Sequence, residues 1–317
     1  MGNKKTKIIV TGGAGFIGSN LVDALVDKGF NVHVIDNLVN GKQENVNKKA
    51  KLHVADITNL KSIQLIINGA DYVFHLAALP RVQYSIENPE ITNKVNVQGT
   101  LNVLVASVNA KAKRLIYSAS SSVYGDQKRF PLKETFFVNP ESPYGLQKYI
   151  GELYCRLWSS IYNLSTVSLR YFNVYGPRQS SKGAYALVIA KFLKQRSEGK
   201  PMTITGDGRQ TRDFTSVHDV VRANILAMKS KKIGKGEVIN IGAGRNQSIL
   251  RIAQLIGGPV SYIPRRLEPH DTLADNKLAY KLLGWKSKIS IKKGIEELKN
   301  TPCPCGSGKK YKKCCGK

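Results

Sequence analysis

Acidic residues and long hydrophobic runs are scarce in this chain. Its 317 residues include 22 Asp and Glu against 49 Lys and Arg, which gives a formal net charge of +27 at pH 7. No apolar run approaches the roughly 20 residues that a membrane-spanning helix needs. The first residues lead straight into a strand pattern and lack the hydrophobic region of a secretory signal. We therefore expect no membrane span and a cytoplasmic location.

The excess of positive charge has three explanations. It is compatible with binding to nucleic acid or an acidic surface, with attraction of an anionic substrate, or with a generally basic proteome. The lysines are scattered along the chain. This scatter favours the last two explanations over a specific nucleic-acid groove.

Cysteine is almost absent from the first 302 residues, where Cys155 stands alone and is expected to pack in the interior. The other four lie near the C-terminus in the pattern Cys-x-Cys, eight residues, Cys-Cys. Four thiolates joined by glycine-containing turns suit tetrahedral zinc, and so small a segment needs the metal to fold. A disulfide knot is the alternative, and a reducing cytoplasm disfavours it. The predicted zinc ligands are Cys303, Cys305, Cys314 and Cys315.

Strand patterns alternate with helical patterns through the first half of the chain. Alternation of this kind predicts an α/β protein with a Rossmann-like, doubly wound parallel sheet that binds its ligands at the carboxyl ends of the strands. We expect this domain to span residues 1–172, with a later strand near 236–242 rejoining it. A smaller C-terminal α/β substrate domain is predicted at 173–300, and the zinc tail at 301–317.

A glycine-rich turn follows the first strand. The run Thr11-Gly-Gly-Ala-Gly-Phe-Ile-Gly18 separates a buried strand from an amphipathic helix. Its glycines permit a tight turn, close approach of the backbone to a pyrophosphate, and close packing of helix on strand. Asp36 ends the second strand, where an acid accepts hydrogen bonds from a ribose 2′-hydroxyl and repels a 2′-phosphate. The pattern therefore predicts a dinucleotide site that prefers NAD to NADP.

Two further strands end in residues that suit the same site. Asp56 ends the third strand and is a plausible adenine contact, and the fourth strand runs into the small residues Ala77 and Ala78. His75 lies at the end of that strand, where we expect a packed structural histidine rather than a catalytic base. Asn96 is the most notable polar residue of the helix that follows.

A tyrosine and a lysine stand four residues apart at the start of a later helix. Ser142 suits the N-cap of this helix and Pro143 its first position, which places Tyr144 and Lys148 on one face. A free phenol has a pKa of about 10; the ammonium and the positive helix end are expected to lower the pKa of Tyr144. A hydroxyl from the serine-rich strand of 115–125 is expected to share the same substrate oxygen. The alternative is a chance pair on a solvated helix.

Together these motifs resemble the extended short-chain dehydrogenases/reductases, specifically the NAD-dependent nucleotide-sugar epimerases and dehydratases. The resemblance covers residues 5 to about 298. It implies that Tyr144 is the base, that Lys148 holds the ribose, and that Ser120 is the catalytic hydroxyl. It also implies a homodimer formed through the helices around 95–110 and 144–160. The implied cofactor contacts are Gly12, Gly15, Phe16, Ile17, Gly18, Asp36, Asn37, Asp56, Ile57, Leu76, Ala77, Ala78, Asn96, Ser118, Tyr144, Lys148 and Phe172.

The resemblance also implies a nucleotide-sugar site. Asn173 is expected to contact the nucleotide-sugar, Arg212 and Arg265 the diphosphate, and Thr272 the substituent at C2 of the sugar. The implied substrate contacts are Ser85, Ser120, Tyr144, Asn173, Arg212, Arg265 and Thr272.

The residues after Ser120 narrow the expected reaction. The 4,6-dehydratases carry an Asp-Glu pair there and decarboxylating relatives usually a Glu, whereas this chain has Ser121-Ser122. The expectation is a 4-epimerase that acts on a UDP-hexose through a 4-keto intermediate. Thr272 is small enough to admit an N-acetyl group, so UDP-GlcNAc/GalNAc stands beside UDP-Glc/Gal, with a UDP-uronic acid third.

The tail supports a different hypothesis. Residues 302–316 resemble the zinc motif at the C-terminus of the bacterial secretion ATPase, which implies a protein partner, and its lysines suit ribosome or nucleic-acid binding. The non-enzymatic alternative is a catalytically idle NAD-binding scaffold that uses its charge and tail to bind RNA or protein. Intact Ser120, Tyr144 and Lys148 argue against idleness.

Overall fold

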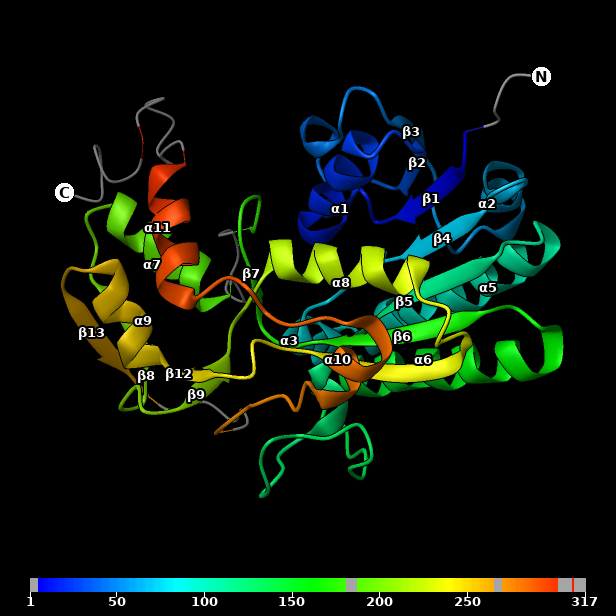
Figure 1. Ribbon diagram of the computed structural model, residues 1–317. Helices are drawn as coiled ribbons and strands as arrows, with labels where there is room; N and C mark the ends of the chain where they lie inside the picture. Colours follow the sequence, from blue (N-terminus) through cyan, green and yellow to red (C-terminus); the bar gives the residue numbers. More distant parts are fainter. Residues whose placement is uncertain (1–4, 181–186, 265–269, 302–309, 311–317) are drawn as a thin grey trace.

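A seven-stranded parallel sheet forms the centre of the protein (Figure 1). The computed structural model describes residues 5–180, 187–264, 270–301 and 310. The strands of this sheet are β1 Lys7–Thr11, β2 Asn31–Asp36, β3 Lys51–Val54, β4 Tyr72–His75, β5 Arg114–Ser120, β6 Thr166–Tyr171 and β11 Lys235–Ile241. Their order across the sheet is β11-β6-β5-β4-β1-β2-β3. The predicted Rossmann-like, doubly wound fold is confirmed.

Most strands of the sheet have buried side chains on both faces. In β1, Ile8 and Val10 lie in one core and Ile9 in the other, and all three are fully buried. Period-two alternation between two cores explains why this strand reads as a continuous apolar run.

Helices cover both faces of the sheet (Figure 1). One core contains residues of α1 Phe16–Asp27, α8 Val217–Lys229 and α10 Lys277–Leu283. The opposite core contains residues of α2 Leu60–Ile67, α5 Gly99–Asn109 and α6 Pro143–Tyr162. Ser142 caps α6 by accepting a hydrogen bond from the Gly145 backbone N–H at 3.1 Å, and Pro143 holds the first position. The predicted start of the Tyr144 helix is therefore confirmed.

Short helices line the carboxyl edge of the sheet. They are η1 Gln43–Asn45, α3 Val82–Glu87, α4 Pro89–Asn93 and the 3₁₀ turn η3 Ser121–Tyr124. A π-helical turn, η2 Lys94–Gln98, joins α4 to α5. Such turns often occur at functional sites, and this one carries Asn96.

A further hydrophobic core, separate from the two on the faces of the sheet, lies beside the sheet at the left of Figure 1. Its helices are α7 Val188–Ser197, α9 Ile249–Ile256 and α11 Ile291–Asn300. Three strand pairs complete this part: β8 Met202–Thr205 with β13 Val260–Ile263, β9 Thr211–Asp213 with β12 Asn246–Ser248, and β7 Val174–Tyr175 with β10 Thr215–Ser216. The strand expected near 236–242 is β11, which pairs with β6. Strand β11 is part of the sheet, and α8 and α10 pack on one face of it. The chain therefore returns to the sheet after entering the second part.

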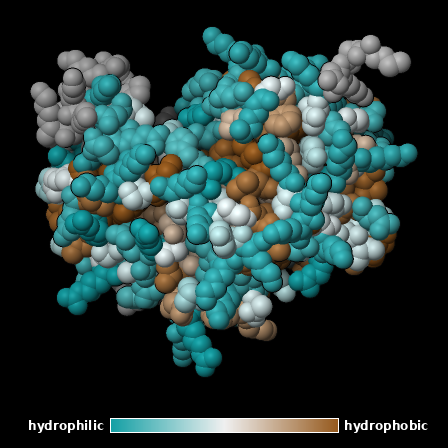
Figure 2. All heavy atoms as spheres, in the orientation of Figure 1, coloured by the Kyte–Doolittle hydropathy of each residue, from teal (hydrophilic) through white to brown (hydrophobic). Residues whose placement is uncertain are grey.

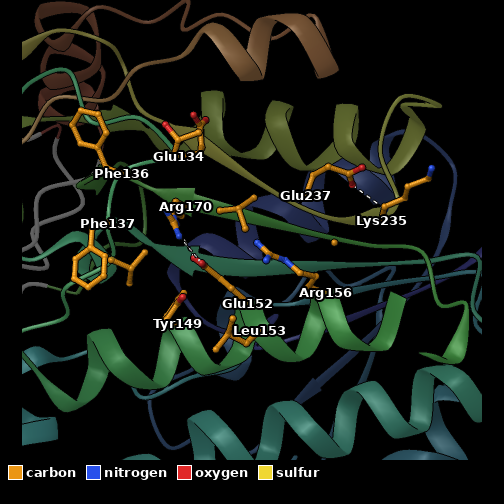
Figure 3. A pocket seen from close by; sticks show the side chains of 14 residues that line it. Glu134, Phe136, Phe137, Tyr149, Glu152, Leu153, Arg156, Arg170, Lys235 and Glu237 are labelled. Atoms are coloured by element: carbon orange, nitrogen blue, oxygen red, sulfur yellow. Dashed lines mark hydrogen bonds and ion pairs between the residues drawn. The ribbon is translucent and has the colours of Figure 1, made fainter. Parts of the chain in front are cut away.

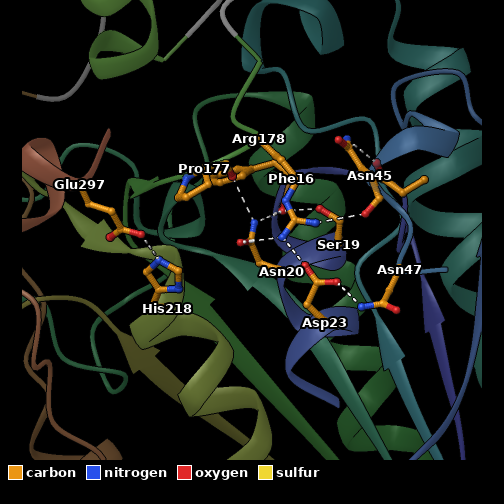
Figure 4. Close-up of polar contacts among 11 residues, drawn as sticks. Phe16, Ser19, Asn20, Asp23, Asn45, Asn47, Pro177, Arg178, His218 and Glu297 are labelled. Atoms are coloured by element: carbon orange, nitrogen blue, oxygen red, sulfur yellow. Dashed lines mark hydrogen bonds and ion pairs between the residues drawn. The ribbon is translucent and has the colours of Figure 1, made fainter. Parts of the chain in front are cut away.

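Polar contacts join the two parts near the start of α1 (Figure 4). Arg178, after β7, donates to Asp23 Oδ2 at 2.5 Å and to Asn20 Oδ1 at 3.1 Å. Asn20 in turn donates to the carbonyls of Phe16 and Pro177. These bonds tie the first turns of the glycine-turn helix to the segment that leads into the second part.

The visible surface is mainly hydrophilic (Figure 2), as the high content of lysine and arginine predicts. Within the described ranges, no helix has the length and apolarity that crossing a bilayer requires.

Candidate active site

The glycine turn is built so that nothing larger than glycine fits at two of its positions. Gly12 has φ +71°, and a Cβ there would lie 2.7 Å from the Ala77 backbone nitrogen. A Cβ on Gly18 would lie 2.1 Å from the Gly12 carbonyl oxygen. The turn therefore brings the start of α1 against the loop after β4, and Gly15, Phe16 and Ile17 remain partly exposed there.

His75 is enclosed by two threonines and has no exposed surface. Its Nδ1 lies 2.7 Å from the Thr11 hydroxyl and its Nε2 3.0 Å from the Thr100 hydroxyl. Thr100 donates to the Asn96 carbonyl, so it accepts from Nε2–H; Thr11 accepts from the Ala77 N–H, which leaves its own proton for Nδ1. Burial, aided by the charge of Lys148, lowers the pKa of His75 to about 3. The expected structural histidine is confirmed.

Two carboxylates end the neighbouring strands β2 and β3. Asp36 is buried and accepts from the backbone N–H groups of Ala14, at 3.0 Å, and Leu38, at 2.9 Å. Asp56 accepts from the Asn37 side chain at 3.0 Å. Burial alone would raise the pKa of Asp56, but hydrogen bonds from Thr58 and Asn37 outweigh it and lower that pKa. Both acids lie at the carboxyl edge, as predicted; their ribose and adenine contacts stay predictions.

Asn96 holds the loop after β4. Its Oδ1 accepts from the Leu79 N–H at 2.8 Å, and its amide donates to the Leu79 carbonyl and to Gln147 Oε1. Gln147 donates onward to Thr92. The residue that attracted attention in the sequence therefore fixes the position of Leu76–Leu79 relative to α6, and a direct cofactor contact stays a prediction.

The hydroxyl of Ser85 bonds to the backbone on both sides, and its substrate contact stays a prediction. Ser85 has no exposed surface, donates to the Val82 carbonyl at 2.6 Å and accepts from the Tyr144 backbone N–H at 3.0 Å. The hydroxyl therefore satisfies one of the free N–H groups at the start of α6. Its role in this structure is to position Tyr144.

Ser120, Tyr144 and Lys148 meet where β5 and α6 come together. The Ser120 hydroxyl lies near that of Tyr144 and acts to lower the Tyr144 pKa. Lys148 is buried, donates from Nζ to the Ser118 carbonyl at 2.7 Å and lies 4.8 Å from the centre of the Tyr117 ring. Ser122, at the start of η3, donates to the Ser120 hydroxyl at 2.9 Å. Tyr144 and Lys148 therefore share α6 beside a serine from the end of β5, and their pairing in catalysis stays a prediction.

The predicted lowering of the Tyr144 pKa is wrong for the protein alone. Burial raises the pKa of Tyr144 to about 12, and the Ser120 hydroxyl offsets only part of this effect. Burial also lowers the pKa of Lys148 to about 8, and its ammonium is directed at the Ser118 carbonyl. Sequence spacing showed that the two groups share a helix face but not how deeply they are buried.

Two further predicted cofactor contacts stay open. Phe172 has no exposed surface, and its ring centre lies 6.2 Å from that of Tyr124; its contact with the nicotinamide stays a prediction. Ser118 is partly exposed beside Lys148, so its cofactor contact stays a prediction.

The structure brings together two predicted substrate residues that lie far apart in the sequence, and their contact with a substrate stays a prediction. Asn173 Nδ2 donates to Thr272 Oγ1 at 3.2 Å, across 99 positions. The Asp213 N–H donates to the same hydroxyl, and the buried Asp213 carboxylate accepts from Ala243, Gly244 and Ala274. Arg212 donates to the carbonyls of Thr211 and His270 at 2.9 and 3.0 Å. These residues form one surface at the end of β9.

Five predicted residues lie outside the described ranges: Arg265 and the four cysteines Cys303, Cys305, Cys314 and Cys315. In the part of the chain that the structure describes, no group of three or more His, Cys, Asp or Glu is arranged to hold a metal ion.

Sequence reasoning missed three residues that build the site. Thr11 binds His75 and the loop after β4, Gln147 binds Asn96, and Asp213 gathers three backbone N–H groups. Only their positions beside recognised motifs could have indicated them. Thr11 begins the glycine turn, Gln147 lies between Tyr144 and Lys148, and Asp213 follows Arg212.

Comparisons with known proteins agree with this geometry. The pattern of the NAD dependent epimerase/dehydratase family matches residues 8–242, and that of the SEC-C motif matches residues 300–317. UDP-glucose 4-epimerase of Mycolicibacterium smegmatis is 34% identical over 307 residues, covering 91% of this chain and 96% of the relative.

Two solved structures are similar along nearly the whole chain. The crystal structure of UDP-glucose 4-epimerase from Thermotoga maritima with UDP-glucose has a TM-score of 0.87 at 40% identity and covers 92% of this chain and 96% of that one. UDP-N-acetylglucosamine 4-epimerase from Methanobrevibacter ruminantium, in complex with UDP-N-acetylmuramic acid, has a TM-score of 0.87 at 36% identity, with 93% and 98% covered. The chain belongs to the NAD-dependent epimerase/dehydratase family.

Proposed function

We propose that the protein is an NAD-dependent 4-epimerase of a UDP-hexose. The observation that carries this proposal is the cluster of Ser120, Tyr144 and Lys148 beside the glycine turn at the carboxyl edge of the sheet. Relatives that match most of the chain include UDP-sugar 4-epimerases. An idle scaffold has no need for a buried tyrosine and a buried lysine on one helix face beside a serine at the end of β5.

The glycine turn fits NAD because its backbone is packed so closely at Gly12 and Gly18 that a Cβ would clash there, and a tight glycine turn of this kind lets a pyrophosphate approach the backbone. Asp36 and Asp56 lie at the ends of the next two strands, where a ribose and an adenine would be held. When bound, NAD accepts a hydride from the sugar and returns it. Its cationic nicotinamide would also oppose the effect of burial on Tyr144 and favour the phenolate.

In the proposed reaction Tyr144 accepts the proton of the sugar 4-hydroxyl. The Ser120 hydroxyl lies near that of Tyr144 and shares the same oxygen, which orients the hydroxyl toward the base. Lys148 supplies positive charge that stabilises the phenolate. Rotation of the keto sugar before the hydride returns would give the other C4 epimer, and Tyr144 returns the proton.

The residues beside Ser120 favour epimerisation over dehydration or decarboxylation. Ser121 and Ser122 occupy η3, and Ser122 donates to the Ser120 hydroxyl. Neither is a carboxylate that takes a proton from C5. Within this proposal the reaction is limited to oxidation and reduction at C4.

The sugar that we favour is an N-acetylhexosamine, with UDP-glucose and UDP-galactose also accepted. Thr272 is small, and its hydroxyl is held by Asn173 and by the Asp213 N–H, which keeps its side chain in place at the proposed sugar site. A UDP-uronic acid is the third choice, because the chain is strongly basic.

The test is an epimerisation assay with UDP-glucose, UDP-N-acetylglucosamine, UDP-glucuronic acid and dTDP-glucose, with a Tyr144→Phe control. We expect epimer to form without added NAD and the rate to fall by at least about 10³-fold in the control, because the base is lost. Purified protein that holds NAD but turns over none of these sugars would contradict the proposal and favour the scaffold hypothesis.

For the tail, we propose that Cys303, Cys305, Cys314 and Cys315 bind one zinc ion and that the folded tail binds a protein or ribosomal partner. The match of residues 300–317 to the SEC-C motif and the four-cysteine spacing support this proposal. Elemental analysis should find about one zinc per chain and none in a Cys303→Ser/Cys305→Ser variant. Unchanged zinc content in that variant would contradict the assignment.

A further inference from the structure

A buried ion pair lies one helical turn beyond Lys148. Glu152 on α6 and Arg170 on β6 are each 2% exposed and are joined by two hydrogen bonds, Arg170 Nε to Oε1 at 2.8 Å and Nη2 to Oε2 at 2.7 Å. The Arg170 guanidinium also lies 4.6 Å from the centre of the Tyr124 ring. Removing one partner of such a pair leaves an uncompensated buried charge and destabilises the fold. Replacing both partners by apolar residues is often neutral, so the pair as a whole contributes little to stability.

The pair lies beside the catalytic cluster but not in it. Glu152 and Arg170 line a cavity of about 500 Å³ between α6, β11 and residues 134–138 (Figure 3). Ser120, Tyr144 and Lys148 are not among the residues that line it. Glu152 lies four residues after Lys148 on α6, a spacing that places both positions on one face of the helix.

The groups packed around Lys148 differ in charge. From β4, His75 is neutral, since its pKa is lowered to about 3 by burial; from β5, the buried Tyr117 has a pKa well above 10. On α6, burial raises the pKa of Tyr144 and of the Cys155 thiol to about 12. Burial also raises the pKa of Glu152, but the guanidinium of Arg170 opposes this effect. Among these described neighbours, Glu152 is the carboxyl group, and both of its oxygens accept hydrogen bonds from the Arg170 guanidinium, the arrangement that suits a carboxylate.

We propose that Glu152 is a positioning residue for Lys148, whose buried carboxylate keeps the Lys148 ammonium protonated behind Tyr144, while Arg170 keeps Glu152 ionised. Burial would otherwise release the Lys148 proton near neutral pH. The consequence for catalysis rests on the proposed function, since loss of that proton removes the charge that stabilises the Tyr144 phenolate.

The first measurement does not depend on activity. Lysines labelled with ¹³C at Cε are titrated by NMR, and the Lys148 signal is assigned by its absence in Lys148→Met. In Glu152→Gln we expect the pKa of Lys148 to fall by on the order of one unit, because a negative charge is lost and Arg170 remains. Glu152→Asp keeps the charge and should leave the pKa near its value in the unsubstituted protein.

A second variant separates charge from stability. Arg170→Met also breaks the pair and should destabilise the protein as Glu152→Gln does. Arg170→Met should lower the Lys148 pKa less than Glu152→Gln does. It removes the positive charge of Arg170, whereas Glu152→Gln leaves that charge without its carboxylate. The alkaline limb of the epimerase pH profile should shift in the same order.

Equal Lys148 titration in the parent and Glu152→Gln would overturn this inference, whatever the loss in melting temperature. A fall in the Lys148 pKa that is as large in Glu152→Asp or Arg170→Met as in Glu152→Gln would also overturn it. These outcomes are distinct from failure of the proposed function, because a protein without epimerase activity still yields a Lys148 titration curve.

Discussion

His75 shows how a titratable residue at the carboxyl end of a strand serves structure. Its two ring nitrogens are used by Thr11 and Thr100, and each threonine is bound in turn to the backbone. The neutral tautomer is therefore part of the link between β1, the loop after β4, and α5. Protonation would place a hydrogen between Nδ1 and a hydroxyl that already donates to it.

We predict that His75 makes the protein less stable in mild acid. Its pKa is about 3 in the folded protein and about 6.5 unfolded, so the unfolded chain binds more protons as the pH falls below 6.5. Between pH 7 and pH 5 this should remove about 2 kcal/mol of unfolding free energy. Denaturant unfolding of the parent and of His75→Gln at both pH values measures it.

His33 and His53 also have lowered pKa values and contribute to the acid sensitivity of both proteins. The difference between the parent and His75→Gln therefore isolates His75. An identical pH dependence in the two proteins would show that His75 does not contribute as expected.

Among elements, the glycine turn and the start of α6 were predictable because they depend on local geometry. A glycine with positive φ, a serine N-cap and a proline at the first helical position each leave a signature within a few residues. The π-helical turn at Asn96 left none, since it is fixed by Leu79 and Gln147 from other elements. The burial of Tyr144, Phe172 and Ser85 could not be predicted from the sequence either, because it depends on packing against other elements.

We predict that Gly12→Ala loses cofactor binding as well as stability. The new Cβ would meet the Ala77 backbone, whereas Gly29→Ala, at φ +82° with no heavy atom within 4 Å, is a matched control for strain alone. Gly29→Ala should lower the free energy of unfolding by about 1 kcal/mol. Thermal unfolding and NAD titration of both variants measure the two effects; equal NAD affinity in the two would contradict the assigned role of the turn.

At the scale of the whole molecule, the sheet was predictable and the meeting of its distant segments was not. Alternating patterns predicted the parallel strands, and the strand expected near 236–242 lies at the sheet edge as β11. The contact between Asn173 and Thr272 depends on how the chain leaves the sheet, returns and leaves again. Pairing across 99 residues has no local signature.

Helix α6 also presents an apolar stripe to solvent. Leu146, Leu153, Leu157 and Ile161 are 43–59% exposed at helical spacing, while Trp158 of the same helix is buried in the core. The apolar side chains of α6 are therefore divided between core and surface. We propose that the exposed stripe is covered by the same helix of a second copy, as the family resemblance implies.

We predict that Leu157→Glu gives a monomer. A charge in the middle of an apolar interface is left without water or a partner. Leu65→Glu on α2, where the leucine is 82% exposed, is the matched control and should leave the assembly unchanged. Analytical ultracentrifugation of the two variants and the parent decides; a parent that sediments as a monomer at micromolar concentration contradicts the proposal.

The late return of β11 to the sheet has a consequence for how the protein is made. Strand β6 ends at Tyr171 and its outer neighbour begins at Lys235, so residues 172–234 must be synthesised between them. At about 5–20 residues per second, this takes roughly 3–13 seconds. Throughout that interval the nascent chain carries an unpaired strand edge, a template for wrong pairing. Chains that stall before residue 235 should therefore be the ones that chaperones capture during translation.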